Sequence, residues 1–132
     1  MKNQYDYNRI EAGFYDKIAR HGRGIRSFWH NQKFNRVKDI LSDRPGRILD
    51  IGCGCGTFLG MLSKETFIEQ CGVDISRKQI EYAQEYYGNE SREFICIETI
   101  RELARFKEGI FDYVTIIEVI EHLKSDRKLP LR

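Results

Sequence analysis

The sequence predicts an α/β fold whose parallel sheet carries helices on both faces. An apolar run at residues 48–51 passes through a glycine-rich loop into a helical pattern at residues 58–62, and a second apolar strand follows at residues 67–75. This strand–helix–strand order is typical of a crossover between parallel strands. A later run at residues 111–118 is apolar and β-branched, as expected of a strand buried on both faces. At 132 residues, the chain is long enough for one core and short for a complete doubly wound enzyme.

Two helices are predicted before the first strand. Residues 5–20 carry apolar side chains at helical spacing, and Gly22 and Gly24 then interrupt the pattern. A second amphipathic helix is expected at residues 27–41, followed by a Pro-Gly turn. We therefore divide the chain into a helical cover at residues 1–45, a core at residues 46–124 and a short polar tail at residues 125–132.

Two capping patterns mark helices after the second strand. Ser76 with Gln79 predicts a helix that runs to the break at residues 88–89. A third strand is expected at residues 93–97, and Thr99 with Glu102 then forms a second capping box. The third strand therefore ends beside a helix start.

The glycine-rich loop predicts a ligand site. Gly52, Gly54 and Gly56 follow the first strand, and acidic residues lie before the loop at Asp50 and at the end of the second strand at Asp74. Parallel strands end at one edge of the sheet, so these residues should face one crevice, where a terminal acid suits ribose hydroxyls. The G-x-G-x-G spacing differs from the dinucleotide pattern G-x-G-x-x-G, and a carboxylate at residue 50 would repel a pyrophosphate. An adenosine bearing a sulfonium and an amino group therefore fits better than the cofactor of a dinucleotide-dependent oxidoreductase.

Composition and charge limit the classes of partner, location and metal site that the sequence allows. The net charge of +2 does not by itself indicate nucleic acid, and the basic cluster at residues 20–26 is typical of a solvated loop. No apolar run approaches the length of a membrane span, and no signal peptide follows Met1, so we expect a cytoplasmic protein. The four cysteines lack paired C-x-x-C spacing, which favours reduced thiols and no metal site.

The run D-I-G-C-G-C-G at residues 50–56, together with Asp74, resembles motif I of the class I S-adenosylmethionine (SAM)-dependent methyltransferases. The resemblance implies a Rossmann-like sheet with strand order 3-2-1-4, SAM as cofactor and S-adenosylhomocysteine as product. It places the methionine half of SAM at the loop, the ribose at residue 74, and the adenine at residues 98–100. The implied cofactor-binding residues are Asp50, Gly52, Cys53, Gly54, Gly56, Asp74, Ile75, Glu98, Thr99, Ile100 and Glu118.

Two further stretches resemble the small-molecule members of that family. The runs E-T-I-R-E-L at residues 98–103 and F-D-Y-V-T-I-I-E-V-I-E-H-L at residues 111–123 are similar to the ubiquinone-biosynthesis O-methyltransferases. The run F-Y-D at residues 14–16 is similar to a Y-Y-D of the same group, which makes Tyr15 a candidate ligand contact. We therefore expect a small-molecule methyl acceptor, and neither DNA nor RNA.

An alternative function attaches to Glu118, Glu121 and His122. This E-x-x-E-H arrangement could bind a divalent metal, as in the small-RNA 2′-O-methyltransferases, whose further histidine this chain lacks. We favour the metal-free arrangement of the small-molecule group, in which His122 is a candidate general base.

The family's sheet has seven strands, whereas this sequence predicts four. We expect a chain truncated after the fourth strand: an expressed fragment, a truncated gene product, or a chain completed by a partner. A non-catalytic or partner-completed SAM-binding module is therefore a second functional hypothesis. The apolar edge of the fourth strand also predicts self-association.

Overall fold

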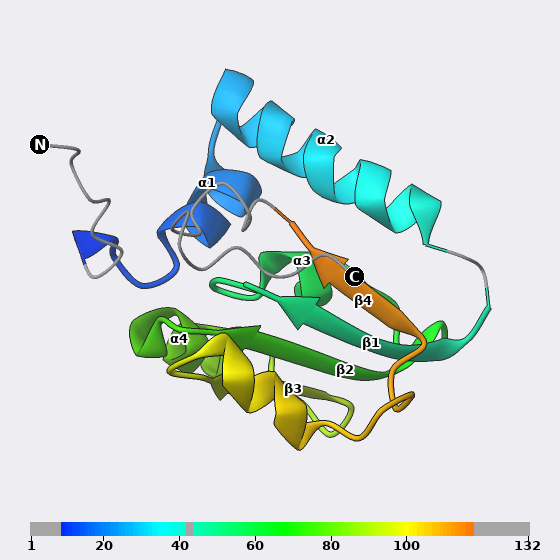
Figure 1. The fold of residues 1–132 in the computed structure, drawn as a ribbon. Helices are drawn as coiled ribbons and strands as arrows, with labels where there is room; N and C mark the ends of the chain where they lie inside the picture. Colours follow the sequence, from blue (N-terminus) through cyan, green and yellow to red (C-terminus); the bar gives the residue numbers. More distant parts are fainter. Residues whose placement is uncertain (1–8, 42–43, 118–132) are drawn as a thin grey trace, which may run out of the picture.

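The computed structural model describes residues 9–41 and 44–117 (Figure 1). Two helices precede a sheet whose strands alternate with short helices. In chain order the elements are α1 (Phe14–His21), α2 (Ile25–Ile40), β1 (Gly46–Ile51), α3 (Thr57–Gly60), β2 (Phe67–Asp74), α4 (Arg77–Tyr87), β3 (Arg92–Cys96), the 3-10 helix η2 (Ile100–Arg105) and β4 (Tyr113–Ile116).

The four strands form one parallel sheet in the order β3-β2-β1-β4, which confirms the predicted order. In this register Asp50 of β1 lies between Gly72 of β2 and Thr115 of β4. Because every strand runs the same way, all four carboxyl ends meet at one edge, with the glycine loop and Asp74 along it (Figure 1).

The two faces of the sheet are covered unequally. On one face, α2, α3 and α4 pack their apolar side chains around Ile48 and Phe94. On the other face, η2 and the segment before β4 cover Leu49 and Val73. The prediction of helices on both faces is therefore confirmed, although η2 is the only helical element that the described residues place on the second face.

The first helix is shorter than the helical pattern of residues 5–20 predicts, and within the described residues it begins only at Phe14. Gly13 precedes it with a left-handed φ of 73°, and its backbone N–H donates to Gln79 Oε1 at 2.9 Å. A Cβ at this position would lie 2.2 Å from the ring of Tyr82. The backbone therefore turns at Gly13 so that α1 packs against α4, and α1 begins only after this turn.

The predicted capping box of Thr99 with Glu102 is complete in the structure, whereas that of Ser76 with Gln79 is only half formed. The Ser76 N–H donates to Asp74 Oδ1, and the Gln79 side chain bonds the backbone before α1 instead. The Ser76 side chain accepts from the Gln79 backbone N–H at the start of α4, and Glu102 Oε2 accepts from the Thr99 N–H at 2.9 Å. The second box begins a 3-10 helix rather than an α-helix. Across the part of the chain that the structure describes, no helix has the length and apolar character needed to cross a membrane.

Candidate cofactor site

Every second residue from 52 to 56 in the glycine loop is a glycine in a left-handed conformation: Gly52 at φ 76°, Gly54 at φ 55° and Gly56 at φ 85°. The Gly52 and Cys53 N–H groups both donate to the Val73 carbonyl, at 2.8 and 3.0 Å, so the loop starts as a continuation of the sheet. These conformations are strained for any residue with a Cβ, which explains the spacing of the glycines.

Gly54 and Gly56 have opposite surroundings. Among the described residues, no atom would lie within 4 Å of a Cβ built on Gly54, whereas one on Gly56 would lie 2.9 Å from both Ala83 and Phe94. Gly56 is therefore needed for close packing of the loop against α4 and β3. Gly54 leaves an open approach to the backbone, which is the property that a ligand-binding loop requires.

Asp74 is fixed directly beside this open position. Its Oδ2 accepts from the Gly54 N–H at 2.9 Å, and its Oδ1 accepts from the Ser76 N–H at 2.8 Å. Each carboxylate oxygen can accept a further hydrogen bond. The carboxylate is thus oriented by the backbone while keeping acceptor capacity for a pair of hydroxyl groups.

Asp50 lies beneath the loop and is almost completely buried, with 3% of its surface exposed. Burial raises the pKa of its carboxyl from 3.8 to about 7; the hydrogen bond from Thr115 opposes this rise, and the negative charge of Asp74 adds to it. Thr115 Oγ1 donates to Asp50 Oδ1 at 2.7 Å. A positive charge nearby would favour the ionised carboxylate, so this position suits a cationic ligand.

A second buried carboxylate, Asp16, ties α1 to the helices around the loop. It is 2% exposed and accepts hydrogen bonds from Thr57 Oγ1 and the Tyr82 hydroxyl, both at 2.7 Å, and from the Tyr87 hydroxyl. Burial and the hydrogen bond to this carboxylate both raise the pKa values of the two tyrosines. Since Thr57 directly follows Gly56, Asp16 anchors the end of the glycine loop.

Sequence reasoning missed the roles of Asp16 and Thr115. Asp16 is the last residue of F-Y-D, of which only Tyr15 was considered as a ligand contact. Tyr15 is half exposed and lies 5.8 Å from the ring of His30, measured between ring centres. Thr115 lies opposite Asp50 in the register of β1 and β4, which the predicted strand order alone does not fix.

Residues 98–100, which were predicted to contact the adenine, lie at the start of η2, where two backbone N–H groups are already hydrogen-bonded. The Glu98 and Thr99 N–H groups both donate to Glu102 Oε2, as helix capping requires. The side chains of Glu98, Thr99 and Ile100 are exposed. They are available to a ligand as side chains, and contact with the cofactor stays a prediction.

The cysteines are unpaired thiols. Cys53 packs in the core beside Ile48, so only its backbone borders the loop opening. Burial raises the pKa of Cys53 well above its ordinary value and that of Cys71 to about 12. Such thiols stay protonated at neutral pH and are poor nucleophiles.

Ile75 follows Asp74 and is exposed at the same edge. The described residues hold no group of three metal-ligating side chains. Glu118, Glu121 and His122 lie outside the described residues, as does the end of the predicted fourth strand.

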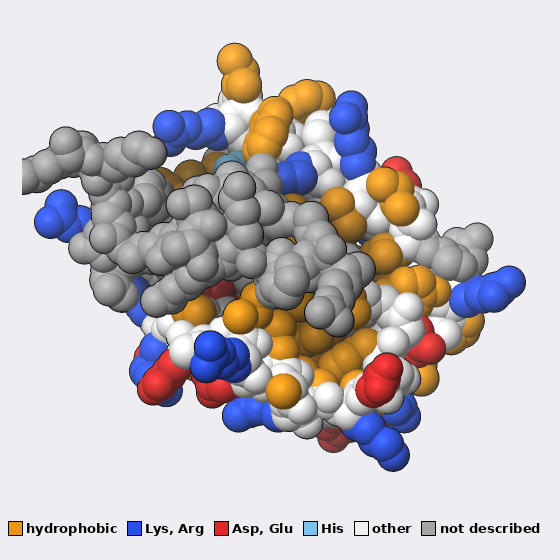
Figure 2. Space-filling model, in the orientation of Figure 1, with side chains coloured by type: hydrophobic (Ala, Val, Ile, Leu, Met, Phe, Trp, Pro, Cys, Tyr) orange, Lys and Arg blue, Asp and Glu red, His pale blue; other side chains and the backbone are white. Residues whose placement is uncertain are grey.

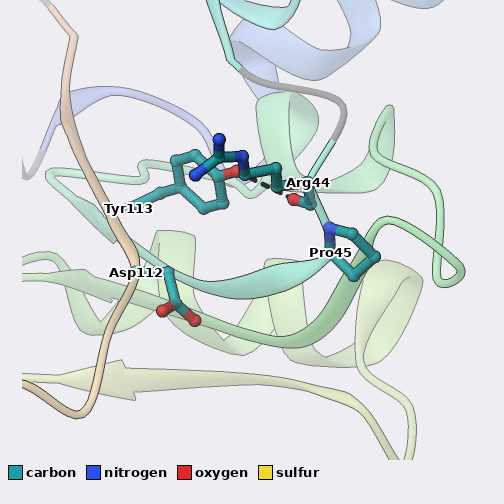
Figure 3. A pocket seen from close by; sticks show the side chains of 4 residues that line it. All are labelled: Arg44, Pro45, Asp112 and Tyr113. Carbon is teal, nitrogen blue, oxygen red and sulfur yellow. Dashed lines mark hydrogen bonds between the residues drawn. The ribbon is translucent and has the colours of Figure 1, made fainter.

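A separate hollow lies at the opposite edge of the sheet (Figure 3). It is lined by Arg44, Pro45, Asp112 and Tyr113, and the Tyr113 hydroxyl donates to the Arg44 carbonyl at 2.8 Å. These residues lie at the amino ends of β1 and β4. The hollow is therefore remote from the glycine loop and does not belong to the candidate site.

Comparisons with known proteins agree with this geometry. A family model described as a methyltransferase domain matches residues 25–129. Norajmaline N-methyltransferase of Rauvolfia serpentina is 31% identical over 130 residues, which cover 92% of this chain and 44% of that protein. The mitochondrial ubiquinone biosynthesis O-methyltransferase of Candida albicans is 29% identical over 109 residues, covering 76% of this chain and 32% of that protein.

A solved structure shows the same arrangement of elements. Magnesium protoporphyrin IX methyltransferase from Synechocystis PCC 6803, crystallised with bound SAM, aligns with a TM-score of 0.61 and 25% identity, covering 85% of this chain and 59% of that chain. The present chain spans less than half the length of the two curated relatives described above.

Proposed function

The chain belongs to the class I SAM-dependent methyltransferases, and we propose that its glycine-loop edge binds SAM and that the whole protein transfers the methyl group to a small molecule. One observation carries the proposal: Gly54 leaves open space beside a carboxylate that its own N–H orients. The family uses SAM, and the two curated small-molecule enzymes described above support an acceptor of that class.

The residues at this edge fit the chemistry of SAM. The Asp74 carboxylate would accept from the ribose hydroxyls, and the open backbone at Gly54 would lie against the methionine half. Asp50 would supply negative charge toward the cationic half, because a nearby cation lowers the pKa that burial has raised. Glu98, Thr99 and Ile100 would border the adenine, and Ile75 the ribose.

When bound, SAM supplies a methyl group on a positively charged sulfur. The acceptor atom forms a bond to the methyl carbon as the carbon–sulfur bond breaks, and an acceptor that carries a proton must lose it. The described residues contribute by orienting the cofactor, which is the main requirement of an in-line displacement. His122 and Glu118 remain candidates for the general base and for a cofactor contact, respectively.

Binding can be tested by titrating the chain with SAM and S-adenosylhomocysteine in a calorimeter, with NADH as a control ligand. We expect both adenosyl ligands to bind and NADH not to bind. Gly54→Ala should weaken binding at least about tenfold, because the added methyl group fills the open approach. Asp74→Asn should weaken binding through loss of the charged acceptor.

Gly109→Ala is a matched control for Gly54→Ala. Gly109 also has a positive φ, 74°, and a built Cβ with no atom within 4 Å in the described part of the chain, but it lies in the turn before β4. Both substitutions carry a similar backbone strain of about 1 kcal/mol. Equal ligand affinities in the two variants would contradict a ligand site at Gly54, and turnover would then have to be sought in a different pocket.

A further inference from the structure

Apolar side chains stand exposed at the start of α2, on the side of the helix turned away from the core. Ile25 is 86% exposed, Phe28 65% and Trp29 54%. The spacing i, i+3, i+4 places them on one helical face. The opposite face is fixed to the protein: the Asn31 amide donates to the Ala19 carbonyl at 2.9 Å, and Phe34 packs in the core beside Phe58.

We call Ile25, Phe28 and Trp29 the α2 patch. In Figure 2, hydrophobic side chains project over the exposed start of α2, with lysine and arginine side chains on both sides. Large exposed aromatic and branched apolar residues gathered on one turn mark an interaction site more often than scattered single ones do. The cofactor edge does not use this patch, since the patch lies on the outer surface of the helical cover.

The segment of chain that carries the α2 patch is basic, although two of its cations, Lys17 and Arg20, pair with carboxylates before it. Residues 17–38 contain seven lysines and arginines and no aspartate or glutamate, although the whole chain has 22 basic and 20 acidic residues. The segment therefore carries +7 while the chain carries +2, so the remaining residues sum to −5. The nearest of these cations, Arg23 and Arg26, are exposed beside Ile25. A partner for this surface must be negatively charged and must also accept apolar side chains.

We propose that the α2 patch docks on an anionic phospholipid surface. Apolar side chains that enter the boundary between headgroups and acyl chains, with lysine and arginine beside them, are the features of interfacial helices. Each basic residue near such a surface adds electrostatic attraction that salt weakens.

The same residues fit single-stranded nucleic acid less well. Bases stack on the open faces of aromatic rings, whereas the Lys33 ammonium already lies over the Trp29 ring, 5.1 Å from its centre. Ile25 is the most exposed of the three side chains and has no ring on which a base could stack. An apolar phase accommodates all three side chains, and a nucleic acid accommodates them only in part.

Vesicle flotation tests the proposal with the chain as it stands. Vesicles of phosphatidylcholine with about one-third phosphatidylserine should carry the chain to the top of the gradient, and vesicles of phosphatidylcholine alone should not. Raising the salt concentration should release the chain. Ile25→Ser should lower the bound fraction, and the double variant Phe28→Ser with Trp29→Ser should lower the apparent affinity about tenfold or more.

Ile40→Ser is the matched control for Ile25→Ser. Ile40 ends the same helix and is 81% exposed, so the two substitutions remove the same group from the same degree of exposure. We expect Ile40→Ser to leave vesicle binding unchanged. An equal fall in both variants would overturn the assignment to the α2 patch.

Two other outcomes would overturn the proposal altogether. One is the absence of binding to the anionic vesicles. The other is a change in oligomeric state, or in binding to a single-stranded RNA oligonucleotide, that follows the patch variants while vesicle binding does not. Circular dichroism of each variant establishes that it is folded, and these outcomes are independent of whether SAM binds at the glycine loop.

Discussion

The buried carboxyl of Asp50 predicts an unusual dependence of stability on pH. In the folded protein its pKa is about 7, because burial disfavours the charged form, and the ordinary value that applies in the unfolded chain is 3.8. Between these two pKa values the folded state therefore keeps a proton on the Asp50 carboxyl that the unfolded state has released. The stabilisation from this proton is fully present below about pH 4 and is lost as the pH rises through about 7.

The difference between the two pKa values, about three units, corresponds to about 4 kcal/mol over the full interval. Between about pH 5 and pH 8 the part that is lost amounts to about 2 to 3 kcal/mol. Asp50→Asn keeps a neutral group of the same shape at every pH, and its amide oxygen can still accept from Thr115. As the pH rises from 5 to 8, the free energy of unfolding of the variant should therefore increase by about 2 to 3 kcal/mol relative to that of the original chain.

Urea unfolding followed by circular dichroism at several pH values measures this gain. The comparison isolates residue 50, because every other titrating group is common to both proteins. Asp39→Asn removes a carboxylate from the exposed end of α2 and serves as the control for the loss of charge alone. If the stability curves of the original chain and of Asp50→Asn run parallel from pH 5 to pH 8, the argument from burial is wrong.

Three further predictions concern the packing and charge of the same edge. Asp16→Ala leaves three hydroxyl groups, two of them buried, without their acceptor and should cost about 3 to 5 kcal/mol in urea unfolding, whereas Tyr87→Phe removes only one donor and should cost about 1 kcal/mol. Gly56→Ala forces a Cβ into contact with α4 and β3 at a positive φ, so its thermal midpoint should fall by about 10 °C or more, while a midpoint close to the original would show that the loop relaxes freely. The affinity for SAM should rise with pH between about 6 and 8 as Asp50 ionises, and calorimetry of Asp50→Asn should show no such rise.

The sequence was sufficient to predict the elements that depend on local patterns. The strand before the glycine loop, the helix start at Ser76 and the capping box of Thr99 with Glu102 all follow from residues close together in the chain. The strand order came from resemblance and is confirmed. The start of α1 could not be predicted in this way, because the turn at Gly13 depends on Gln79 and on the ring of Tyr82.

The buried polar contacts of the site were unpredictable for the same reason. Asp16 meets Thr57 and Tyr87 across separations of 41 and 71 residues, and Asp50 meets Thr115 across 65. Nothing in a local pattern distinguishes a buried aspartate with three donors from an exposed one on a helix. Asp16 is buried because α1 packs against α3 and α4, and this packing is known only from the three-dimensional structure.

These contacts explain how the loop can be both open and fixed. A stretch of backbone with left-handed glycines and no side chains would be flexible if nothing held its ends. Here the first end is bonded to the Val73 carbonyl, the middle to Asp74, and the far end is held through Thr57 by Asp16. Because the fixing groups lie at and below the loop, no other part of the described chain fills the space above Gly54. A ligand would therefore meet a preformed backbone, and Asp16 would contribute to affinity through the loop end that it holds.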